Sequence, residues 1–221
     1  MFKNTTKHAK VSTPLPRREG QGGGSSNGRL SIPAGYLDDV REAVRIMKEG
    51  GVILYPTDTI WGLGCDARNA EAVRRIYQIK QRVDSKALIC LVDTEARLEQ
   101  HVEHVPDIAW QLIDCADTPL TIIYDHGRGL APDLLADDGS VGIRLTREIF
   151  SMLLCQHMHG AVVSTSANIS GQPSPKTFRD IPPEIKDAVD YVCLSRRNER
   201  TPAAPSHIVK LTDDGVVTVI R

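Results

Sequence analysis

Three cationic side chains stand close together near the middle of the chain, directly before an apolar run. Lys80, Arg82 and Lys86 precede ALICLV, residues 87–92. Cations this close repel one another unless an anion neutralises them, and phosphate is a common partner because Arg binds its oxygens as a fork and Lys as a point charge. The cluster therefore predicts phosphate binding. A solvated basic surface is the alternative, which the adjoining buried strand disfavours.

A second stretch, YPTDTIWGLGCDA at residues 55–67, combines hydroxyl groups with glycines. Thr57 and Thr59 can donate hydrogen bonds to a small polar ligand and accept them from it, and Gly62 and Gly64 allow close approach to the backbone. The GxGxxA spacing is only a weak dinucleotide-binding signal, because no acidic residue is clearly placed to bind a ribose. The stretch indicates either a small-molecule site or a tight turn without a ligand.

A third polar region follows later apolar runs. SVGIRLT, residues 140–146, and STSANISGQPSP, residues 164–175, are rich in small hydroxyl residues. Their hydroxyls and backbone N–H groups can bind phosphate oxygens, although the Walker A pattern is absent. Taken alone, the region could also be a Ser-rich turn.

Helical and strand patterns alternate along the chain and must position these three regions. Amphipathic spacing predicts helices over residues 37–49, 71–81, 94–101, 106–114 and 148–159, and another that begins at the Pro182-Pro183 pair. Apolar runs predict strands over residues 52–57, 87–92, 120–125, 140–146, 161–166, 191–194, 207–211 and 216–221, the last two joined by a turn at Asp213-Asp214-Gly215. The pattern predicts an α/β, or mixed α+β, fold with a twisted open mixed sheet flanked by helices. Because ligands of open α/β sheets bind at the carboxyl ends of strands, we expect the three regions to form one site.

Composition limits the class of protein. The chain has 221 residues, a formal net charge of -1 and 41% hydrophobic residues, which suits one domain and excludes a polycation. Residues 1–30 are rich in Gly, Ser, Pro and charge, so we expect a disordered extension there, with an RNA-contacting arm as the alternative, followed by a catalytic domain over residues 31–221. The five cysteines are widely spaced without a CxxC pair, which predicts a reducing, cytoplasmic location.

Metal-binding and membrane functions are disfavoured by the sequence. Cys155, His157 and His159 could be taken as metal ligands, but no second ligand pair has suitable spacing. No apolar run approaches the roughly 20 residues that span a bilayer. The basic N-terminus is not followed by the apolar region of a secretory signal.

The chain resembles the YrdC/TsaC family of threonylcarbamoyl-AMP synthases in its single-domain form. The motifs that carry the resemblance are, in order, PTDTIWGLGCDA, IKQR with Lys86, GIR, and STSANISG with PSP. The resemblance extends from about residue 37 to Arg221. The resemblance implies a concave, basic cavity on the sheet. It implies a nucleotidyltransferase that converts L-threonine, bicarbonate and ATP, with magnesium, into threonylcarbamoyl-adenylate and pyrophosphate. A partner complex would then transfer the threonylcarbamoyl group to an adenosine of tRNA.

The resemblance also implies a role for each matching residue. Lys80 and Arg82 match a KxR motif that faces the carbamate and the phosphates, so they are the expected catalytic residues. The residues expected to bind ATP are Arg82, Lys86, Ser140, Ser166, Asn168, Ser174 and Arg221. Those expected to bind threonine are Thr57, Thr59, Arg144, Ser164 and Ser206, with Arg144 on the substrate carboxylate. Magnesium is expected through the phosphates of ATP, with no metal ligand from the protein.

The sequence departs from the family pattern at three places, and it leaves two other functions open. DTPLT at residues 117–121 stands where the family has PGP, His207 replaces a threonine, and Val83 replaces a proline. The first alternative function is a double-stranded RNA-binding module without catalysis, which would recognise phosphates and 2′-hydroxyls. The second is a carbamoyl-transfer domain like that of hydrogenase maturation proteins. It is disfavoured because no acylphosphatase or zinc-finger segment accompanies it.

Overall fold

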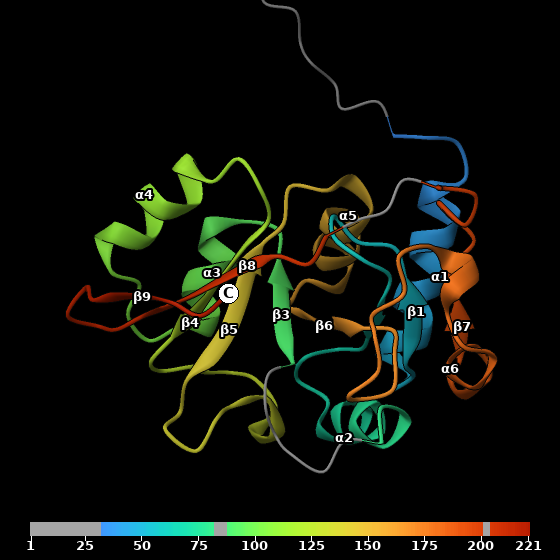
Figure 1. Ribbon diagram of the computed structural model, residues 1–221, viewed down its shortest axis with the longest axis horizontal. Helices are drawn as coiled ribbons and strands as arrows, with labels where there is room; N and C mark the ends of the chain where they lie inside the picture. Colours follow the sequence, from blue (N-terminus) through green and yellow to red (C-terminus); the bar gives the residue numbers. More distant parts are fainter. Residues whose placement is uncertain (1–31, 82–87, 201–203) are drawn as a thin grey trace, which may run out of the picture. The chain divides into compact units, whose positions relative to one another are not determined.

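The described residues form one mixed sheet in which neighbouring strands are often distant in sequence. The computed structural model describes residues 32–81, 88–200 and 204–221. The strand order is β7-β1-β2-β6-β3-β5-β4-β8-β9 (Figure 1). The strands are β1 (Ile53–Tyr55), β2 (Gly62–Gly64), β3 (Ile89–Val92), β4 (Leu120–Tyr124), β5 (Val141–Leu145), β6 (Val162–Ser166), β7 (Tyr191–Val192), β8 (His207–Leu211) and β9 (Val217–Val219).

The pairing register places small and polar residues in neighbouring positions across the middle of the sheet. Strand pairs β1–β7, β3–β5 and β4–β8 are parallel, and the other pairs are antiparallel. Ile89 of β3 lies opposite Ser164 of β6 on one side and Gly142 of β5 on the other. Gly62 of β2 lies opposite Ser166 of β6. The polar regions predicted to form a site are therefore adjacent in the sheet.

Helices α2, α3 and α5 are capped by the side chain of the residue just before each of them. They are α1 (Tyr36–Lys48), α2 (Ala70–Ile79), α3 (Glu95–His101), α4 (Asp107–Cys115), α5 (Ile149–Met158) and α6 (Pro183–Ala188), with short 3-10 turns at Pro132–Leu134 and Phe178–Asp180. The Asn69 side chain accepts hydrogen bonds from Glu71 N and Ala72 N at the start of α2. The Glu148 carboxylate accepts bonds from the first turn of α5. Caps of this kind satisfy N–H groups that have no partner inside the helix.

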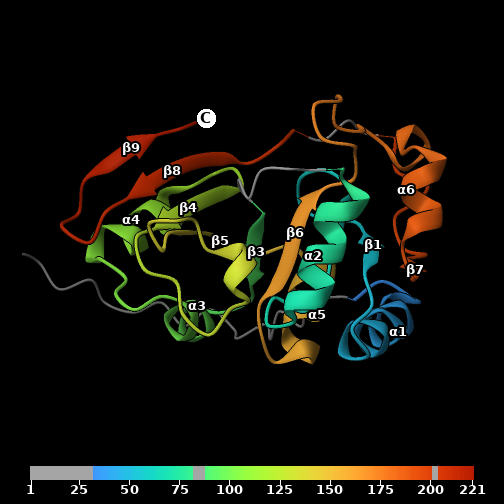
Figure 2. The same ribbon diagram turned by 90° about the horizontal axis from the view of Figure 1, so that it is seen from below.

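Two apolar clusters cover the faces of the sheet unequally. Helices α2, α3, α4 and α6 contribute to the larger cluster, which includes Leu54, Cys90 and Val163 of the strands. Helices α1 and α5 form the smaller cluster with the alternate strand residues, such as Tyr55 and Leu91, and Figure 2 shows both helices near the β1 and β6 end of the sheet. Successive strand residues point to opposite faces. The second face is thus covered at one end, while the part over β5, β4 and β8 carries no helix from the smaller cluster.

Most elements predicted from the sequence are confirmed, as is the open mixed α/β fold. The helix predicted over residues 37–49 is Tyr36–Lys48, and the strand predicted over residues 161–166 is Val162–Ser166. Strand β2 was not predicted, because Gly62 and Gly64 do not show the β-branched pattern of a strand. The expected N-terminal extension, residues 1–30, lies outside the described residues.

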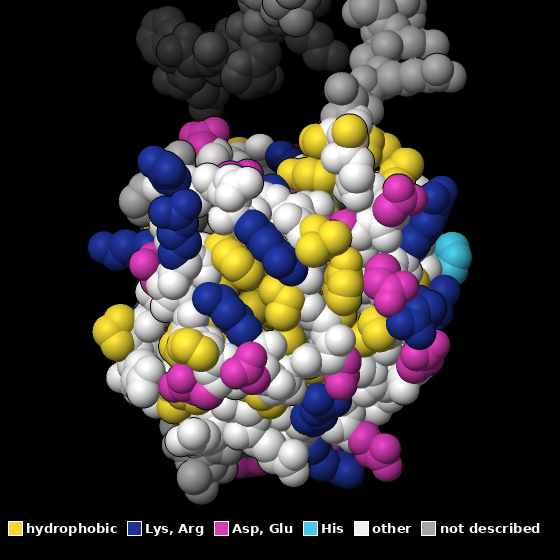
Figure 3. All heavy atoms as spheres, turned by 90° about the vertical axis from the view of Figure 1, so that its right-hand side faces the viewer, with side chains coloured by type: hydrophobic (Ala, Val, Ile, Leu, Met, Phe, Trp, Pro, Cys, Tyr) yellow, Lys and Arg dark blue, Asp and Glu magenta, His cyan; other side chains and the backbone are white. Residues whose placement is uncertain are grey.

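Charged side chains on one side of the molecule are mixed in sign. Figure 3 shows acidic and basic side chains interspersed on the side of the molecule formed by α1, α6 and β7. Arg45, for example, forms ion pairs with Glu42 and Glu49 on α1. Exposed pairs of this kind contribute about 0–1 kcal/mol each, so the apolar clusters are the main source of stability. Among the described residues, no helix is both long enough and apolar enough to cross a membrane.

Candidate active site

A cavity of about 320 Å³ opens on the part of the second sheet face that α1 and α5 leave uncovered. We call it the substrate cavity. Its base is formed by residues that the register brings together, including Gly62 and Ile89. Among the residues predicted from the sequence, those that line it are Thr59, Arg144, Ser164, Ser166, Ser174, Ser206 and Arg221. The structure therefore gathers the TDT, GIR and STSANISG regions into one hollow, while the cationic segment that the sequence also predicts there contributes no described residue to its lining.

An adjoining apolar pocket of about 330 Å³ continues the hollow towards β4. Ile89 and Ile208 line both cavities, and Ser140 belongs to the adjoining pocket. Ser140 N donates a hydrogen bond to the carboxylate of Asp138 at 3.0 Å, and Lys210 pairs with the same carboxylate. Bonds from Ser140 and Lys210 lower the pKa of Asp138, so this carboxylate is ionised at neutral pH. Ser140 thus lies beside the substrate cavity and outside its wall.

Arg144 is the buried cation of the substrate cavity. It is 2% exposed, and its Nη2 donates to Asp58 Oδ1 at 2.8 Å. Its Nε is also buried and has no hydrogen-bond partner among the described residues. A buried donor without a partner costs about 1–3 kcal/mol, and more when it is charged. The guanidinium of this cavity-lining residue therefore carries a donor for which the described residues supply no acceptor.

The two threonines of the TDT motif have different surroundings. The Thr57 hydroxyl donates to Ile60 O at 2.8 Å and accepts from Thr59 N at 3.0 Å, so it closes the turn. Thr59 lines the substrate cavity, and its Oγ1 lies 2.9 Å from Thr57 Oγ1. Thr59 is consequently the hydroxyl placed to meet a ligand, while Thr57 shapes the turn that presents it.

Lys80 directly joins the cationic segment to the loop that follows β6. The residue is 2% exposed, and its ammonium donates to Ser166 O at 2.5 Å and to Asn168 O at 2.8 Å. Ser170 N donates back to Lys80 O at 2.9 Å. Lys80 does not line the substrate cavity in this structure. Its hydrogen bonds hold the loop after β6, whose Ser166 and Ser174 line the cavity. The other two cations of the cluster, Arg82 and Lys86, lie outside the described residues.

Asn168 occupies the turn that Lys80 holds. Its side-chain nitrogen donates to Ile169 O and to Gln172 O, which closes the loop on itself. Its Oδ1 is buried without a partner in the part of the chain that the structure describes. Asn168 is absent from the lining of the substrate cavity. The structure thus places it behind the loop that carries Ser166.

The late residues Ser206 and Arg221 both line the substrate cavity. The Ser206 hydroxyl lies 2.9 Å from Thr121 Oγ1 of β4. Arg221 donates to Ser206 O through Nε at 3.3 Å and through Nη2 at 3.2 Å. The two residues predicted from the late motifs are therefore in contact with each other.

Two residues of the site were not predicted from the sequence. Asp58 pairs with Arg144, and burial raises the pKa of this carboxyl while Arg144 opposes the rise. Arg196 donates to Thr57 O at 2.9 Å and pairs with Glu148 at 3.2 Å. A signal for Asp58 was present, since it stands between the two threonines of the motif. Nothing in the local sequence indicates Arg196.

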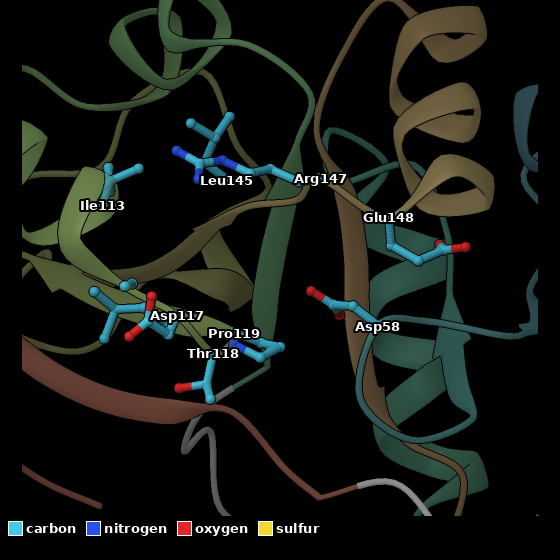
Figure 4. Close-up of a pocket in the computed structure, with 10 residues that line it drawn as sticks. Asp58, Ile113, Asp117, Thr118, Pro119, Leu145, Arg147 and Glu148 are labelled. Carbon is cyan, nitrogen blue, oxygen red and sulfur yellow. The ribbon is translucent and has the colours of Figure 1, made fainter. Parts of the chain in front are cut away.

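A further pocket of about 280 Å³, drawn in Figure 4, is lined by Asp58. Asp58 and Glu148 extend from one side of it, and the Asp117–Pro119 segment lies across from them. This segment is the DTPLT departure from the family pattern. His207, the second departure, is exposed at the start of β8, and Val83 lies outside the described residues.

An open mixed sheet with a hydroxyl-lined hollow and a buried arginine defines an α/β protein with a candidate small-molecule site. A family model for the Sua5/YciO/YrdC domain, described as telomere recombination, matches residues 45–221. The chain therefore belongs to the Sua5/YciO/YrdC family, which confirms the resemblance seen in its motifs.

Similar proteins carry a common name. The threonylcarbamoyl-AMP synthase of Idiomarina loihiensis is 31% identical over 159 residues, which are 71% of this chain and 86% of that protein. The Pseudomonas aeruginosa protein of the same name is 35% identical over 152 residues, 68% of this chain and 81% of its own length. The crystal structure of P. abyssi Sua5 complexed with L-threonine matches 82% of this chain with a TM-score of 0.71 and 23% identity, and this chain spans 53% of that Sua5 chain. At this identity, the likeness to Sua5 shows the fold alone.

Proposed function

We propose that this protein is a threonylcarbamoyl-AMP synthase, which forms threonylcarbamoyl-adenylate and pyrophosphate from L-threonine, bicarbonate and ATP. The observation that carries the proposal is the buried Arg144, which lines a cavity rich in hydroxyl groups and whose Nε has no hydrogen-bond partner among the described residues. The names of the relatives from Idiomarina loihiensis and Pseudomonas aeruginosa support the same activity. The enzyme class that fits is a nucleotidyltransferase acting on ATP.

The lining of the cavity suggests how the two substrates are divided. Arg144 binds the carboxylate of threonine, because a guanidinium and a carboxylate form a strong, directional pair. Thr59, Ser164 and Ser206 supply hydroxyls around the amino acid. The residues that we assign to ATP are Ser166, Ser174 and Arg221 in the substrate cavity, Ser140 in the adjoining pocket, and Arg82 and Lys86 from the segment before β3.

The reaction joins two anions. The amino nitrogen of threonine bonds to the carbon of bicarbonate with loss of water, and an oxygen of the resulting carbamate then bonds to the α-phosphorus of ATP as pyrophosphate leaves. Two unit charges of like sign 4 Å apart repel by about 4 kcal/mol at an effective dielectric of 20. Nearby cations must offset this repulsion, and Arg82 is the cation that we assign to the reacting groups. No nucleophilic side chain is required, so catalysis rests on positioning and charge stabilisation.

Lys80 supports this chemistry through the loop after β6. Its ammonium holds the carbonyl oxygens of Ser166 and Asn168, which fixes the Ser166 side chain at the cavity wall. Magnesium would reduce the charge of the triphosphate when it is bound with ATP. Among the described residues, no group of three or more His, Cys, Asp and Glu side chains could hold a metal ion, so the proposal assigns magnesium to the phosphates.

The product would serve tRNA modification. A partner transferase complex would pass the threonylcarbamoyl group to an adenosine of tRNA, in line with the activity proposed for the chain. A double-stranded RNA-binding module without catalysis stays the alternative prediction. Titration with double-stranded RNA at two salt concentrations, with and without ATP, separates the two. Salt-sensitive binding unaffected by ATP would mark a separate RNA surface.

The test of the proposed function is pyrophosphate release by the purified chain with magnesium and ATP. We expect release that requires both L-threonine and bicarbonate, with no release when carbon dioxide and bicarbonate are removed from the buffer. L-serine in place of threonine should give slower turnover. Pyrophosphate release at the same rate without threonine, or none with all substrates present, would contradict the proposal.

A further inference from the structure

Asp58 is the partner of Arg144, and none of the expected site roles includes it. Asp58 Oδ1 accepts a hydrogen bond from Arg144 Nη2 at 2.8 Å, and the two side chains are 16% and 3% exposed. A buried ion pair of this kind is weak evidence for stability, because desolvation of the charges offsets much of their attraction. A role in function therefore explains the Asp58–Arg144 pair better than a role in stability does.

The turn that carries Asp58 is held in place on both sides. Within it, the Thr57 hydroxyl binds Ile60 O and Thr59 N. From outside, Arg196 donates to Thr57 O at 2.9 Å while its guanidinium also pairs with Glu148 and Glu199. Arg196 adopts a left-handed φ of 61°, a conformation that a non-glycine residue holds only when its surroundings determine it. The carboxylate of Asp58 is thus presented from a fixed backbone.

The pairing leaves part of the guanidinium available to a ligand. An arginine has five N–H donors in a planar fork, and one of those on Nη2 is used by Asp58. The Nε of Arg144 is buried and without a partner among the residues described, and Arg144 lines the substrate cavity. A carboxylate is the natural anion for such a fork, because it accepts two parallel N–H bonds. Fixing one nitrogen also fixes the plane of the others.

We propose that Asp58 is a positioning residue, which locks the plane of the Arg144 guanidinium so that its remaining donors bind the carboxylate of the amino-acid substrate. The inference rests on the proposed function, because it assigns that carboxylate to L-threonine. Asp58 acts through Arg144 and does not contact the reacting atoms. It lines the pocket of about 280 Å³ and a smaller pocket of about 150 Å³ that Thr57 and Arg196 also line, and it does not line the substrate cavity itself.

The experiment measures the Kd of L-threonine by calorimetry for the full chain and for single variants. Asp58→Asn keeps the shape of the side chain and removes its charge. We expect its Kd for L-threonine to rise about tenfold or more, with Kd for ATP within about twofold of wild type. Asp117→Asn is the matched control, since Asp117 is an exposed carboxylate that lines the same pocket as Asp58, and we expect no change.

Two further measurements separate positioning from a general loss of structure. If Asp58 acts through Arg144, the double variant of Asp58→Asn with Arg144→Gln should bind L-threonine no more weakly than Arg144→Gln alone. L-threoninamide, which lacks the carboxylate, should bind wild type and Asp58→Asn equally. Should Asp58→Asn fail to fold by circular dichroism, Asp58→Glu keeps the charge but displaces it, and we expect a severalfold rise in Kd.

The outcomes distinguish this inference from the proposed function. An unchanged Kd in Asp58→Asn, or in Asp58→Glu where only that variant folds, would overturn the positioning role while the synthase proposal stood. The positioning role would also be overturned if the double variant raised the Kd for L-threonine by the product of the factors measured for Asp58→Asn and Arg144→Gln alone. Wild-type protein that binds no L-threonine would instead reject the proposed function.

Discussion

Two buried cations with different tasks set the chemistry of the cavity. Arg144 reaches its wall with a donor that no described residue accepts. Lys80 donates to the backbone carbonyls of the loop after β6 and lies behind that wall. One cation is thus placed to meet the ligand, and the other orders the groups around it. Both are costly to bury, which favours a role in binding over a role in stability.

Replacing Lys80 should therefore impair the proposed synthase activity. Lys80→Met keeps the length of the side chain but leaves the carbonyl oxygens of Ser166 and Asn168 without its ammonium. We expect the rate of pyrophosphate release to fall about tenfold or more, because a hydroxyl-bearing wall of the cavity loses its fixed position. Lys48→Met, at the exposed end of α1, is the control and should retain the wild-type rate. A wild-type rate of pyrophosphate release in a folded Lys80→Met protein would show that Lys80 is not needed to order the site.

The sequence predicted several of the residues that line the cavity, and it did not predict their long-range partners. Thr59, Arg144 and Ser164 follow from the order of the motifs, and all three line the cavity. The Asp58–Arg144 bond joins residues 86 positions apart, and the Arg196–Thr57 bond joins residues 139 apart. Pairing over such distances depends on the register of strands, which local patterns do not contain.

At the scale of elements, strand β2 explains why glycines follow the TDT turn. A Cβ on Gly64 would lie 2.6 Å from Tyr55 Cε1 and 2.9 Å from Val163 O. Only glycine lets β2 fit between β1 and β6 at this point. The same absence of side chains at Gly62 leaves room for the substrate cavity, which Gly62 lines.

We expect Gly64→Ala to lower the free energy of unfolding by about 1–3 kcal/mol, because the added methyl group must displace a buried tyrosine ring or the backbone. Denaturant unfolding monitored by circular dichroism measures the change. Gly62→Ala, whose closest contact would be 3.1 Å, is the comparison and should cost less. Equal stability of Gly64→Ala and wild type would show that the strands have more space than this packing implies.

The helices were predictable for a simple physical reason, and β2 was not. Apolar residues such as Val40, Val44 and Met47 recur at helical spacing on α1 and are buried. Strand β2 is three residues long, and two of them are glycines. It is a strand because its neighbours on both sides provide hydrogen bonds, so tertiary context overrides a weak local preference.

For the whole molecule, the unequal cover of the sheet creates the site. Helices α1 and α5 cover one end of the second face, and the rest of that face holds the substrate cavity and the adjoining apolar pocket. The sequence predicted helices on a mixed sheet but not which face each helix covers. Periodicity identifies the buried side of a helix and does not identify the surface that buries it.

The stability of the fold should depend on pH through His101, the last residue of α3. Burial, with Arg68 and Arg97 nearby, lowers its pKa, while its bond to Arg128 O and the charge of Asp66 oppose the shift. Below pH 6.5 His101 becomes protonated in the unfolded chain but stays neutral in the folded chain. The free energy of unfolding therefore falls as pH drops from 6.5 towards the lowered pKa. We expect His101→Gln to remove this part of the slope and exposed His104→Gln to keep it, in urea unfolding between pH 5 and 7. Identical slopes in all three proteins would exclude His101 as the cause.

The central claim is that the hollow on the sheet binds L-threonine by its carboxylate beside the nucleotide. A crystal structure with L-threonine and a non-hydrolysable ATP analogue tests it most directly. We predict the amino-acid carboxylate within hydrogen-bond distance of Arg144 Nε, with Thr59 and Ser164 around it and the phosphates near Ser166. Threonine bound elsewhere, or an Arg144 Nε that stays without a partner when both ligands are present, would contradict the account.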